Sequence, residues 1–221
     1  MDVNNFWKDV FSWSDYVKGS TYSASDLTSE VLIVRLRKDN PNIDDSVSYK
    51  DKIASWVGSA IHSQIERIMK TYDSVETEVR MSHKNLSGTC DLVFNKKTLA
   101  DVKTGSETNI KAGIKDSTKW IIQLSIYRIL YFKQYKIMLD DEAIILWYCT
   151  DTKKFGEHPI ELLSIDETNK LIRDFMVKVN QPLESLDRCK LCIPFMHKFC
   201  GVKLICPFWK IDDDFSNISE W

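Results

Sequence analysis

The 221-residue sequence contains few glycines and prolines and no long hydrophobic run. Only seven glycines and five prolines occur, and no stretch of the chain has the composition of a linker. The longest apolar runs, such as residues 143–149, are far shorter than the roughly 20 residues of a membrane-spanning helix. The start, MDVNNFWKDV, lacks the basic and apolar segments of a signal peptide. We therefore expect a cytoplasmic protein that has no membrane partner.

The sequence also lacks an excess of charge of either sign. It has 30 Lys and Arg residues against 32 Asp and Glu residues, so its formal net charge is −2. A global basic field of the kind that attracts nucleic acids is therefore absent. Hydrophobic residues make up 43% of the chain, which at this length is enough for a well-buried core. Any nucleic acid must be recognised by a local site.

Two hydrophobic periodicities divide the sequence into helical and extended segments. Apolar residues recur at steps of three and four in the predicted helices, and a period of two marks several predicted strands. We predict helices over residues 23–37, 49–72, 117–138 and 166–180, and strands over 75–82, 87–94, 98–104, 142–150 and 155–160. This order predicts an α/β (α+β) fold, in which helices flank a mixed central sheet.

The division into domains follows from the position of the cysteines. Four of the six cysteines lie close to the C-terminus. We expect a core over residues 1–187, with a helical part (1–72), a catalytic sheet and helix (73–160) and a C-terminal helix (161–187). A cysteine-rich segment and an acidic tail would then occupy residues 188–221. The tail after Pro207 is either a solvated terminus or a docking peptide for a partner protein.

Two carboxylates, Asp91 and Asp101, lie on adjacent predicted strands that a turn at residues 95–97 joins. Such a hairpin can bring both side chains to one point on the sheet. Lys103 follows two residues after Asp101, so strand alternation places these two side chains on the same face. Carboxylates hold Mg²⁺ or Mn²⁺, which activate water and neutralise phosphate charge, while a lysine can orient or deprotonate that water. The three residues therefore predict a centre for phosphodiester cleavage.

An Asp-x-Lys sequence alone is weak evidence for such a centre. The same pattern also occurs on solvated strand faces and in surface ion pairs. Here, however, Leu99, Ala100 and Val102 surround Asp101 in an apolar strand. Charged side chains in such a strand are costly unless they are used.

His62 lies in the long helix predicted before these strands. A neutral imidazole is a good ligand for a divalent transition ion and would favour Mn²⁺. A lone helical histidine is more often a surface residue or a core residue, but Gly58, one turn earlier, would allow a strand or a substrate to approach closely. Glu66 follows His62 by four residues and is a candidate to support it.

Gln123 and Tyr127 are also spaced by four on a predicted helix. A glutamine can contact a metal-bound water or a phosphate, and a tyrosine can donate to a phosphate or stack on a base. Either residue alone would be assigned only to the helix.

These residues fall into four ordered motifs. They are G-x-x-x-H at Gly58 to His62, G-T-x-D at Gly88 to Asp91, D-x-K-T at Asp101 to Thr104 and Q-L-x-x-Y at Gln123 to Tyr127. Together they resemble the RecB-like nuclease branch of the PD-(D/E)XK superfamily, which includes CRISPR-associated adaptation exonucleases. The resemblance covers about residues 23–150. It implies a restriction-endonuclease-like core.

The resemblance also implies roles for individual residues. His62, Asp91 and Asp101 would be metal ligands, and the carbonyl of Val102 would add another. Lys103 would be catalytic, together with the two aspartates. Gln123 and Tyr127 would belong to the helix that helps to define a DNA channel, and Ser23 and Ser25 resemble the family's N-terminal Ser-x-Ser helix start.

The C-terminal cysteines predict a second metal or cluster site, formed by Cys189, Cys192, Cys200 and Cys206. Four thiolates within eighteen residues suit either a tetrahedral zinc ion or a four-iron cluster. The family resemblance favours [4Fe–4S], with structural Zn²⁺ as the alternative. Relatives with a cluster combine three C-terminal cysteines with one N-terminal cysteine, whereas here no cysteine precedes Cys90, so Cys206 must supply the fourth ligand. Cys90 and Cys149 lie in predicted strands and are expected in the core.

The sequence therefore predicts a divalent-metal-dependent deoxyribonuclease that acts on DNA ends or single strands. It would be an exonuclease or a flap-type endonuclease of DNA recombination, repair or replication, with a protein of those pathways as a further partner. One alternative is a catalytically silent subunit of the same fold that binds DNA or supports assembly. Another is a zinc-ribbon interaction module, but it leaves the four upstream motifs unexplained.

Overall fold

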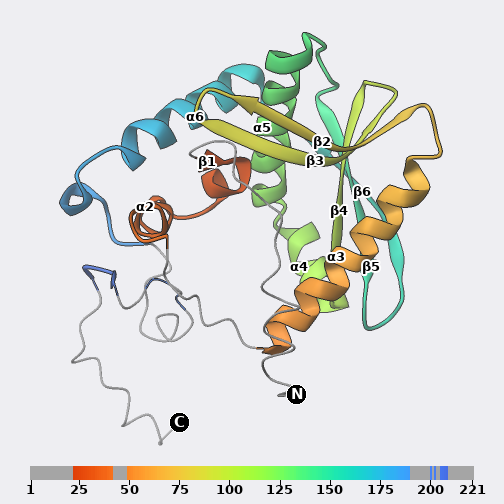
Figure 1. The fold of residues 1–221 in the computed structure, drawn as a ribbon, viewed down its shortest axis with the longest axis horizontal. Coiled ribbons are helices and arrows are strands. Elements are labelled where there is room, and N and C mark those ends of the chain that lie inside the picture. The colour runs from red at the N-terminus through yellow and green to blue at the C-terminus, as the bar shows by residue number, and fades with distance from the viewer. Residues whose placement is uncertain (1–21, 42–48, 190–199, 201, 203–204, 209–221) are drawn as a thin grey trace, which may run out of the picture. The chain divides into compact units, whose positions relative to one another are not determined.

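The computed structural model describes residues 22–41, 49–189, 200, 202 and 205–208 (Figure 1). Contacts group these residues into two compact units. The first takes those within Met1–Thr28 and Val47–Leu171, and the second takes those within Ser29–Ser46 and Ile172–Trp221. The expected boundary after residue 187 stays a prediction.

The first unit is built on a mixed sheet, as predicted, but the sheet has six strands where the sequence predicted five. Its strands are β1 (Tyr22–Ser23), β2 (Val75–His83), β3 (Leu86–Phe94), β4 (Thr98–Gly105), β5 (Glu142–Cys149) and β6 (Phe155–Glu161). The order is β1-β3-β4-β5-β6, and β2 pairs with β3 on its other edge. The β1–β3 and β4–β5 pairs are parallel, while the other pairs are antiparallel.

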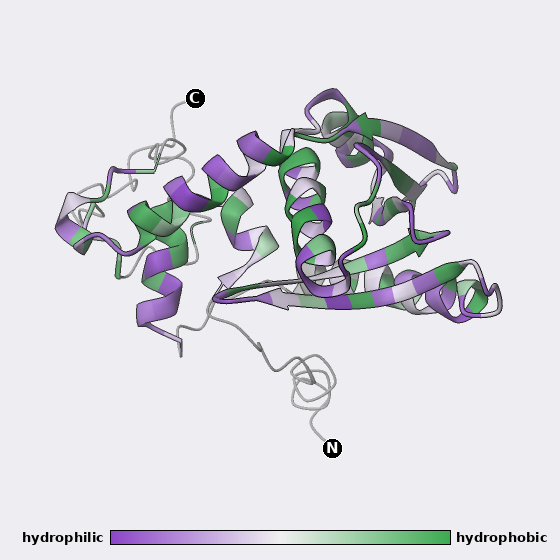
Figure 2. Cartoon of the chain, turned by 90° about the horizontal axis from the view of Figure 1, so that it is seen from above, coloured by the Kyte–Doolittle hydropathy of each residue, from purple (hydrophilic) through white to green (hydrophobic). Residues whose placement is uncertain are grey.

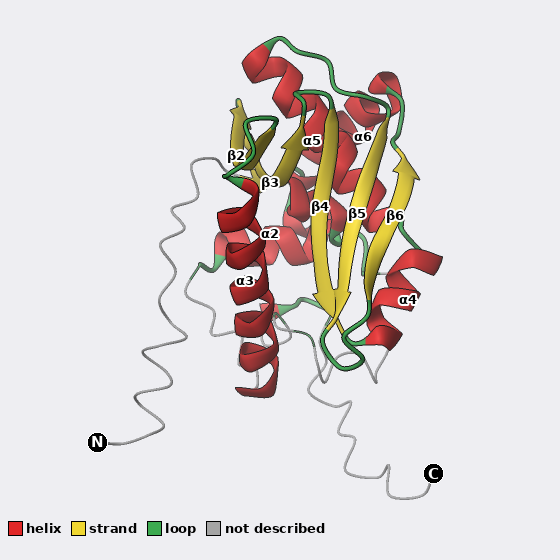
Figure 3. Cartoon of the chain, turned by 90° about the vertical axis from the view of Figure 1, so that its right-hand side faces the viewer, coloured by secondary structure: helices red, strands yellow, loops and turns green. Residues whose placement is uncertain are grey.

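Helices cover both faces of this sheet. Helix α3 (Tyr49–Met69) lies on one face and α5 (Thr118–Tyr135) on the other (Figure 3). Eight consecutive residues of α5, from Leu124 to Tyr131, are buried, because the helix is covered both by the sheet and by the short η1 (Ala24–Thr28). The unit also contains α4 (Glu107–Lys115), and α6 (Ile165–Val179) starts in it. In the described part of the chain, no helix combines the length and the apolar character that a membrane span requires.

Strand β3 has different partners along its two halves, and this creates a fork in the sheet. Near its end β3 pairs with β4 over Leu92–Phe94, and near its start it pairs with β1 over Leu86 and Ser87. Between these stretches, residues 88–91 of β3 do not pair with β4. Strand β4 instead continues to Gly105 with β5 as its partner. The β2–β3 ribbon accordingly crosses the direction of β4 and β5 (Figure 1).

The turn between β3 and β4 has the geometry that its sequence predicts. Asn95 and Lys96 have positive φ angles of 54° and 52°, and the Lys97 N–H donates to the Phe94 carbonyl at 2.9 Å. Two successive positive φ angles define a type I′ hairpin turn, for which asparagine is well suited. This turn sets the register that places Leu92 opposite Ala100.

One predicted helix is wrong, and one observed helix was not predicted. The single helix expected over residues 23–37 is wrong, because the chain forms β1, η1 and then α2 (Val31–Asp39). Ser23 and Asp26 cap η1 reciprocally: the Ser23 N–H donates to Asp26 Oδ2 at 2.6 Å, and the Asp26 N–H donates to Ser23 Oγ at 3.3 Å. Helix α4 was not predicted, although Ser106 provides its N-cap by accepting from the Asn109 N–H.

The second unit is organised around α2. Figure 2 shows this helix as hydrophobic over its first turns and hydrophilic at its C-terminal end. Its side chains Leu32 and Leu36 form a buried cluster with Leu186 and Val202. Three of the predicted cluster ligands, Cys189, Cys200 and Cys206, pack against these residues. The fourth, Cys192, and the tail over 209–221 lie outside the described residues.

Candidate active site

The fork between β3 and β4 brings the two predicted carboxylates together. Asp91 lies on β3 just beyond the last pair with β4, and Asp101 lies on β4 just beyond its end of that pair. The Val102 N–H, which faces no carbonyl of β3 at this point, donates to Asp91 Oδ2 at 2.7 Å. The Asp91 carboxylate therefore takes the place of a strand partner.

Asp101 and Lys103 form an ion pair on β4. The Lys103 Nζ atom lies 2.6 Å from Asp101 Oδ2. Asp101 is only 4% exposed, and its burial raises the pKa of its carboxyl group, an effect that Lys103 opposes and Asp91 reinforces. Although Lys103 is this close, Oδ2 is buried without a hydrogen bond of ordinary geometry. A divalent ion that binds Asp101 through this oxygen would therefore compete with Lys103 for it.

His62 reaches the carboxylates from α3. Its Nδ1 lies 3.5 Å from Asp91 Oδ2, and this contact raises the pKa of the imidazole, while partial burial opposes the shift. Gly58 allows α3 to come this close, since a Cβ atom there would lie 2.9 Å from Thr104 Oγ1 on β4. The expectation that Gly58 gives room for a neighbouring strand is confirmed.

The four predicted groups thus lie close to one another at the fork, and they include an imidazole and two carboxylates, with the Val102 N–H bound to Asp91. Oxygen donors with one imidazole suit Mn²⁺, and oxygen donors alone suit Mg²⁺. Among the described residues, no three His, Cys, Asp or Glu side chains are already directed at a common point as in a formed metal site. Asp91 instead faces His62 and Val102, while Asp101 faces Lys103, so ion binding would exchange these contacts.

Two hollows open beside the carboxylates. A cavity of about 20 Å³ is lined by His62, Glu66, Glu78, Asp91 and hydrophobic side chains, and it has room for one water molecule. A cleft of about 1040 Å³ lies on the other side of His62, and Glu78 borders both spaces. An open cleft with mixed polar and apolar walls therefore adjoins the chemical centre at His62 and Glu78.

Glu78 is a site residue that the sequence did not indicate. It lies opposite Asp91 in the antiparallel register of β2 and β3 and has a positive φ of 46°. Positive φ is uncommon for a residue other than glycine, and such distortions tend to occur at functional sites. No local sequence signal marks it, because in sequence Glu78 is one more polar position of a strand.

Gln123 and Tyr127 lie beneath the site. Gln123 Nε2 donates to Tyr127 Oη at 2.7 Å, and Tyr127 is 5% exposed, so burial raises the pKa of its phenol. The tyrosine ring packs on Gly88, where a Cβ atom would lie 2.4 Å from Tyr127 Cε1. The structure thus joins two of the motifs, but it places the Tyr127 ring in the core rather than where it could stack on a base.

Substitution of Gly88 by alanine tests this packing. We expect Gly88→Ala to lower the free energy of unfolding by about 1–3 kcal/mol, because the new methyl group overlaps a buried ring. Gly105→Ala is the matched control, since a Cβ atom there would be 3.7 Å or more from its neighbours. Urea denaturation of both variants measures the difference, and equal stabilities would contradict the close packing of Tyr127.

Three other expectations concern residues near the site. Glu66 forms an ion pair with Lys70 rather than supporting His62. Cys90 and Cys149 are 0% and 1% exposed, which confirms that they are core residues. Burial raises the pKa of the Cys90 thiol well above its ordinary value, so this cysteine is an unreactive part of the core.

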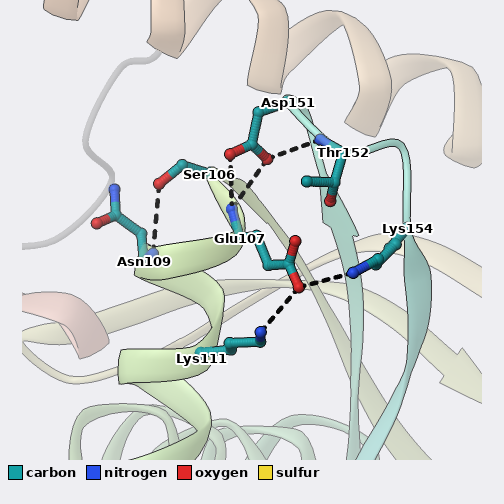
Figure 4. A network of polar contacts seen from close by, with 7 residues as sticks. All are labelled: Ser106, Glu107, Asn109, Lys111, Asp151, Thr152 and Lys154. Carbon is teal, nitrogen blue, oxygen red and sulfur yellow. Dashed lines mark hydrogen bonds and ion pairs between the residues drawn. The ribbon is translucent and has the colours of Figure 1, made fainter.

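A polar network holds the start of α4 at one end of the cleft (Figure 4). Asp151 accepts from the Glu107 N–H at 2.9 Å, and the Glu107 carboxylate contacts Lys111 at 2.8 Å and Lys154 at 2.9 Å. These two lysines lower the pKa of Glu107 to about 2. The network positions the neighbouring Ser106 and Asn109, which line the cleft.

Comparison with known proteins shows similarity in fold but not in sequence. The chain matches no protein-family model, and no curated protein matches it. The crystal structure of SSO0001 superposes with a TM-score of 0.62 at 19% identity and covers 95% of this chain and 98% of its own. LHK-Exo in complex with dAMP has a TM-score of 0.50 at 15% identity, over 74% of this chain and 90% of its own. A second structure of LHK-Exo, an alkaline exonuclease from Laribacter hongkongensis, has a TM-score of 0.48 at 12% identity, over 73% and 89%. The fold of this chain is therefore similar to that of an alkaline exonuclease.

Proposed function

We propose that this protein is a divalent-metal-dependent deoxyribonuclease of the RecB-like branch of the PD-(D/E)XK nucleases. The observation that carries the proposal is the meeting of His62, Asp91, Asp101 and Lys103 at the fork between β3 and β4. The similarity in fold to a protein described as an alkaline exonuclease supports it. Its substrate would be DNA ends or single strands, in recombination, repair or replication in the cytoplasm.

The residues at the fork fit a divalent ion. His62, Asp91, Asp101 and the Val102 carbonyl would hold Mg²⁺ or Mn²⁺, and the strongest feature of this donor set is the proximity of the His62 imidazole to the Asp91 carboxylate beside the buried Asp101. When bound, the ion supplies an activated water and neutralises charge on the phosphate.

The other groups of the site then have distinct tasks. Lys103 would orient the attacking water through its ammonium group, which lies beside Asp101. Gln123 and Tyr127 have a supporting task. The Tyr127 ring packs on β3 at Gly88, and a hydrogen bond from Gln123 fixes its hydroxyl group. The two residues therefore position the carboxylate strands and do not contact the substrate directly.

Digestion of end-labelled linear DNA, single-stranded and double-stranded, tests the proposal against a catalytically silent subunit of the same fold. We expect cleavage in Mn²⁺ and in Mg²⁺, and none in EDTA. Circular substrates measured in parallel distinguish an exonuclease from an endonuclease. Binding of DNA without cleavage in either ion would identify the silent subunit, and cleavage that continues in EDTA would exclude the metal mechanism.

We also propose a [4Fe–4S] cluster on Cys189, Cys192, Cys200 and Cys206, with structural Zn²⁺ as the alternative. In support, the three of these cysteines that the structure describes pack on one apolar cluster, together with Leu186 and Val202. Four thiolates suit either centre, and because the three described cysteines do not by themselves form a group that could hold a metal ion, the site would require Cys192 and a rearrangement of these side chains.

Purification under anaerobic conditions should yield a brown protein that contains iron and sulfide. Cys206→Ala should lose the metal, while Cys149→Ala, which removes a thiol from the core of the sheet, should keep it. Zinc without iron would replace the cluster by a zinc site. Loss of no metal in Cys206→Ala would contradict the proposed fourth ligand.

A further inference from the structure

We propose that the cleft beside His62 binds one strand of single-stranded DNA, with a base stacked on Trp56 and a backbone phosphate paired with Lys153. This inference rests on the proposed nuclease function and specifies how its substrate is held. Neither residue belongs to a motif that the sequence analysis singled out.

The cleft is continuous with the candidate active site. It has a volume of about 1040 Å³, and His62 forms part of its wall. One side is the part of α3 from Ser55 to Ser63, and the other is formed by the ends of β4 and β5 with the start of α4. A strand bound in the cleft would therefore lead past His62 to the two carboxylates.

The lining is suited to a sugar-phosphate backbone. Hydroxyl and amide groups predominate, from Ser59, Ser63, Thr104, Ser106, Asn109 and Thr150. Such groups form the main uncharged contacts to phosphate and sugar oxygens in complexes with nucleic acids. The lining contains one side chain of each charge, Lys153 and Glu78, so a phosphate would be drawn toward the Lys153 side.

The Lys153 ammonium group is positioned by a hydrogen bond to a main-chain carbonyl, and its charge is not neutralised by that contact. Lys153 has a positive φ of 61°, and its Nζ donates to the Thr150 carbonyl at 2.5 Å. No carboxylate of the described residues forms an ion pair with it, whereas the adjacent Lys154 is paired with Glu107 (Figure 4). An ammonium group has three donors, so two remain for a phosphate.

The start of α4 does not compete with Lys153 as the phosphate-binding group. Asp151 already accepts the Glu107 N–H, and Ser106 Oγ accepts the Asn109 N–H. The negative Glu107 side chain also lies at this helix end. The positive charge of the cleft therefore comes from Lys153.

Trp56 is not part of the cleft wall, but Ser55 and Val57 on either side of it in the chain are, and its ring is largely in solvent. It is 57% exposed, and it shares a face of α3 with Ser59 and Ser63, which are three and seven residues further on and line the cleft. Exposure of a tryptophan is costly unless the ring is used, and stacking of a base recovers that cost. In a duplex the faces of the bases are covered by their neighbours, so a base that stacks on Trp56 must come from a single strand.

Fluorescence anisotropy with oligothymidylate in EDTA tests the proposal without any cleavage. We expect Trp56→Ala to weaken binding about tenfold, the loss of one stacked base. Lys153→Asn should weaken binding. It should also reduce the slope of log affinity against log salt concentration by the amount expected for about one phosphate contact. Asparagine is chosen because it tolerates positive φ.

The chain offers a matched control for each variant. Tyr72 is an aromatic residue of similar exposure, 56%, beyond the other end of α3. Lys136 has a φ of 62° and donates to the Lys133 carbonyl at 2.8 Å, which reproduces the environment of Lys153 away from the cleft. Tyr72→Ala and Lys136→Asn should bind oligothymidylate as the parent does, and equal losses in the controls would overturn the proposal.

An abasic oligonucleotide of the same length separates the two contacts. Trp56→Ala should then bind it as well as the parent does, while Lys153→Asn should still bind it less tightly. If Trp56→Ala loses the same affinity for the abasic strand, stacking is excluded. Because no metal is present, failure of the nuclease proposal would leave these results intact, whereas unchanged binding in both variants would overturn the cleft proposal alone.

Discussion

Asp101→Asn is expected to lower DNA cleavage by at least about 1000-fold, the equivalent of the several kcal/mol that a bound ion contributes to the transition state. The substitution keeps the shape of the side chain but removes the negative charge that an ion requires. Asp91 cannot replace it, because the proposed site requires both carboxylates as ligands.

The same variant should not be less stable than the parent protein at neutral pH. Burial raises the pKa of Asp101, so in the parent the free energy of unfolding falls as the pH rises from the ordinary value of 3.8 through the raised value. Asparagine has no charge to bury, and this decrease should be absent from the variant. Urea denaturation midpoints of both proteins, measured at pH values below and above this pH interval, check whether stability falls with rising pH in the parent only.

Asp140→Asn serves as the control for Asp101→Asn. Asp140 accepts from Thr98 Oγ1 and lies 3.9 Å from Lys97 Nζ at the far end of β4. Its substitution should leave the initial rate of cleavage unchanged. Cleavage that persists at the parental rate in folded Asp101→Asn would remove the carboxylate from the mechanism.

Lys103→Met is expected to lower the cleavage rate by about 100- to 10,000-fold, the range for loss of a positioned proton-transfer group. It should also lower the free energy of unfolding by roughly 2 kcal/mol, less than for a fully buried ion pair, since the lysine is partly exposed. The cause is that Asp101 loses the ammonium 2.6 Å away and keeps a buried, unpaired charge. Initial rates and urea denaturation measure the two effects.

The double variant Lys103→Met with Asp101→Asn distinguishes stability from chemistry. Removal of both charges should restore most of the lost stability but none of the activity. Lys97→Met is the exposed-lysine control, since its pair with Asp140 is long and solvated, and it should change stability by less than about 1 kcal/mol. An unchanged stability of Lys103→Met would contradict the ion pair.

Local patterns predicted most of the secondary structure because they depend on neighbouring residues only. The periods of three to four and of two identified α3, α5 and strands β2 to β6 to within a few residues. The prediction failed where a short capping pair competed with the longer pattern, as Ser23 and Asp26 do at η1. It also missed α4, because a helix of nine residues offers only about two turns in which a three- and four-residue period can be recognised.

The sequence by itself determined the chemical groups at the site and their order along the chain. Asp101 and Lys103 share a face by strand alternation, and the Asn95 turn fixes their register against β3. These relations extend over a few residues, so they are visible in one sequence.

Only the tertiary structure decided what surrounds those groups. The fork at Asp91, the burial of Tyr127 against Gly88 and the cleft between Ser59 and Lys153 each join segments that are far apart in the sequence. Strand pairing and close packing arise from many long-range contacts at once, and no local pattern encodes where two strands part or which ring fills the space above a glycine.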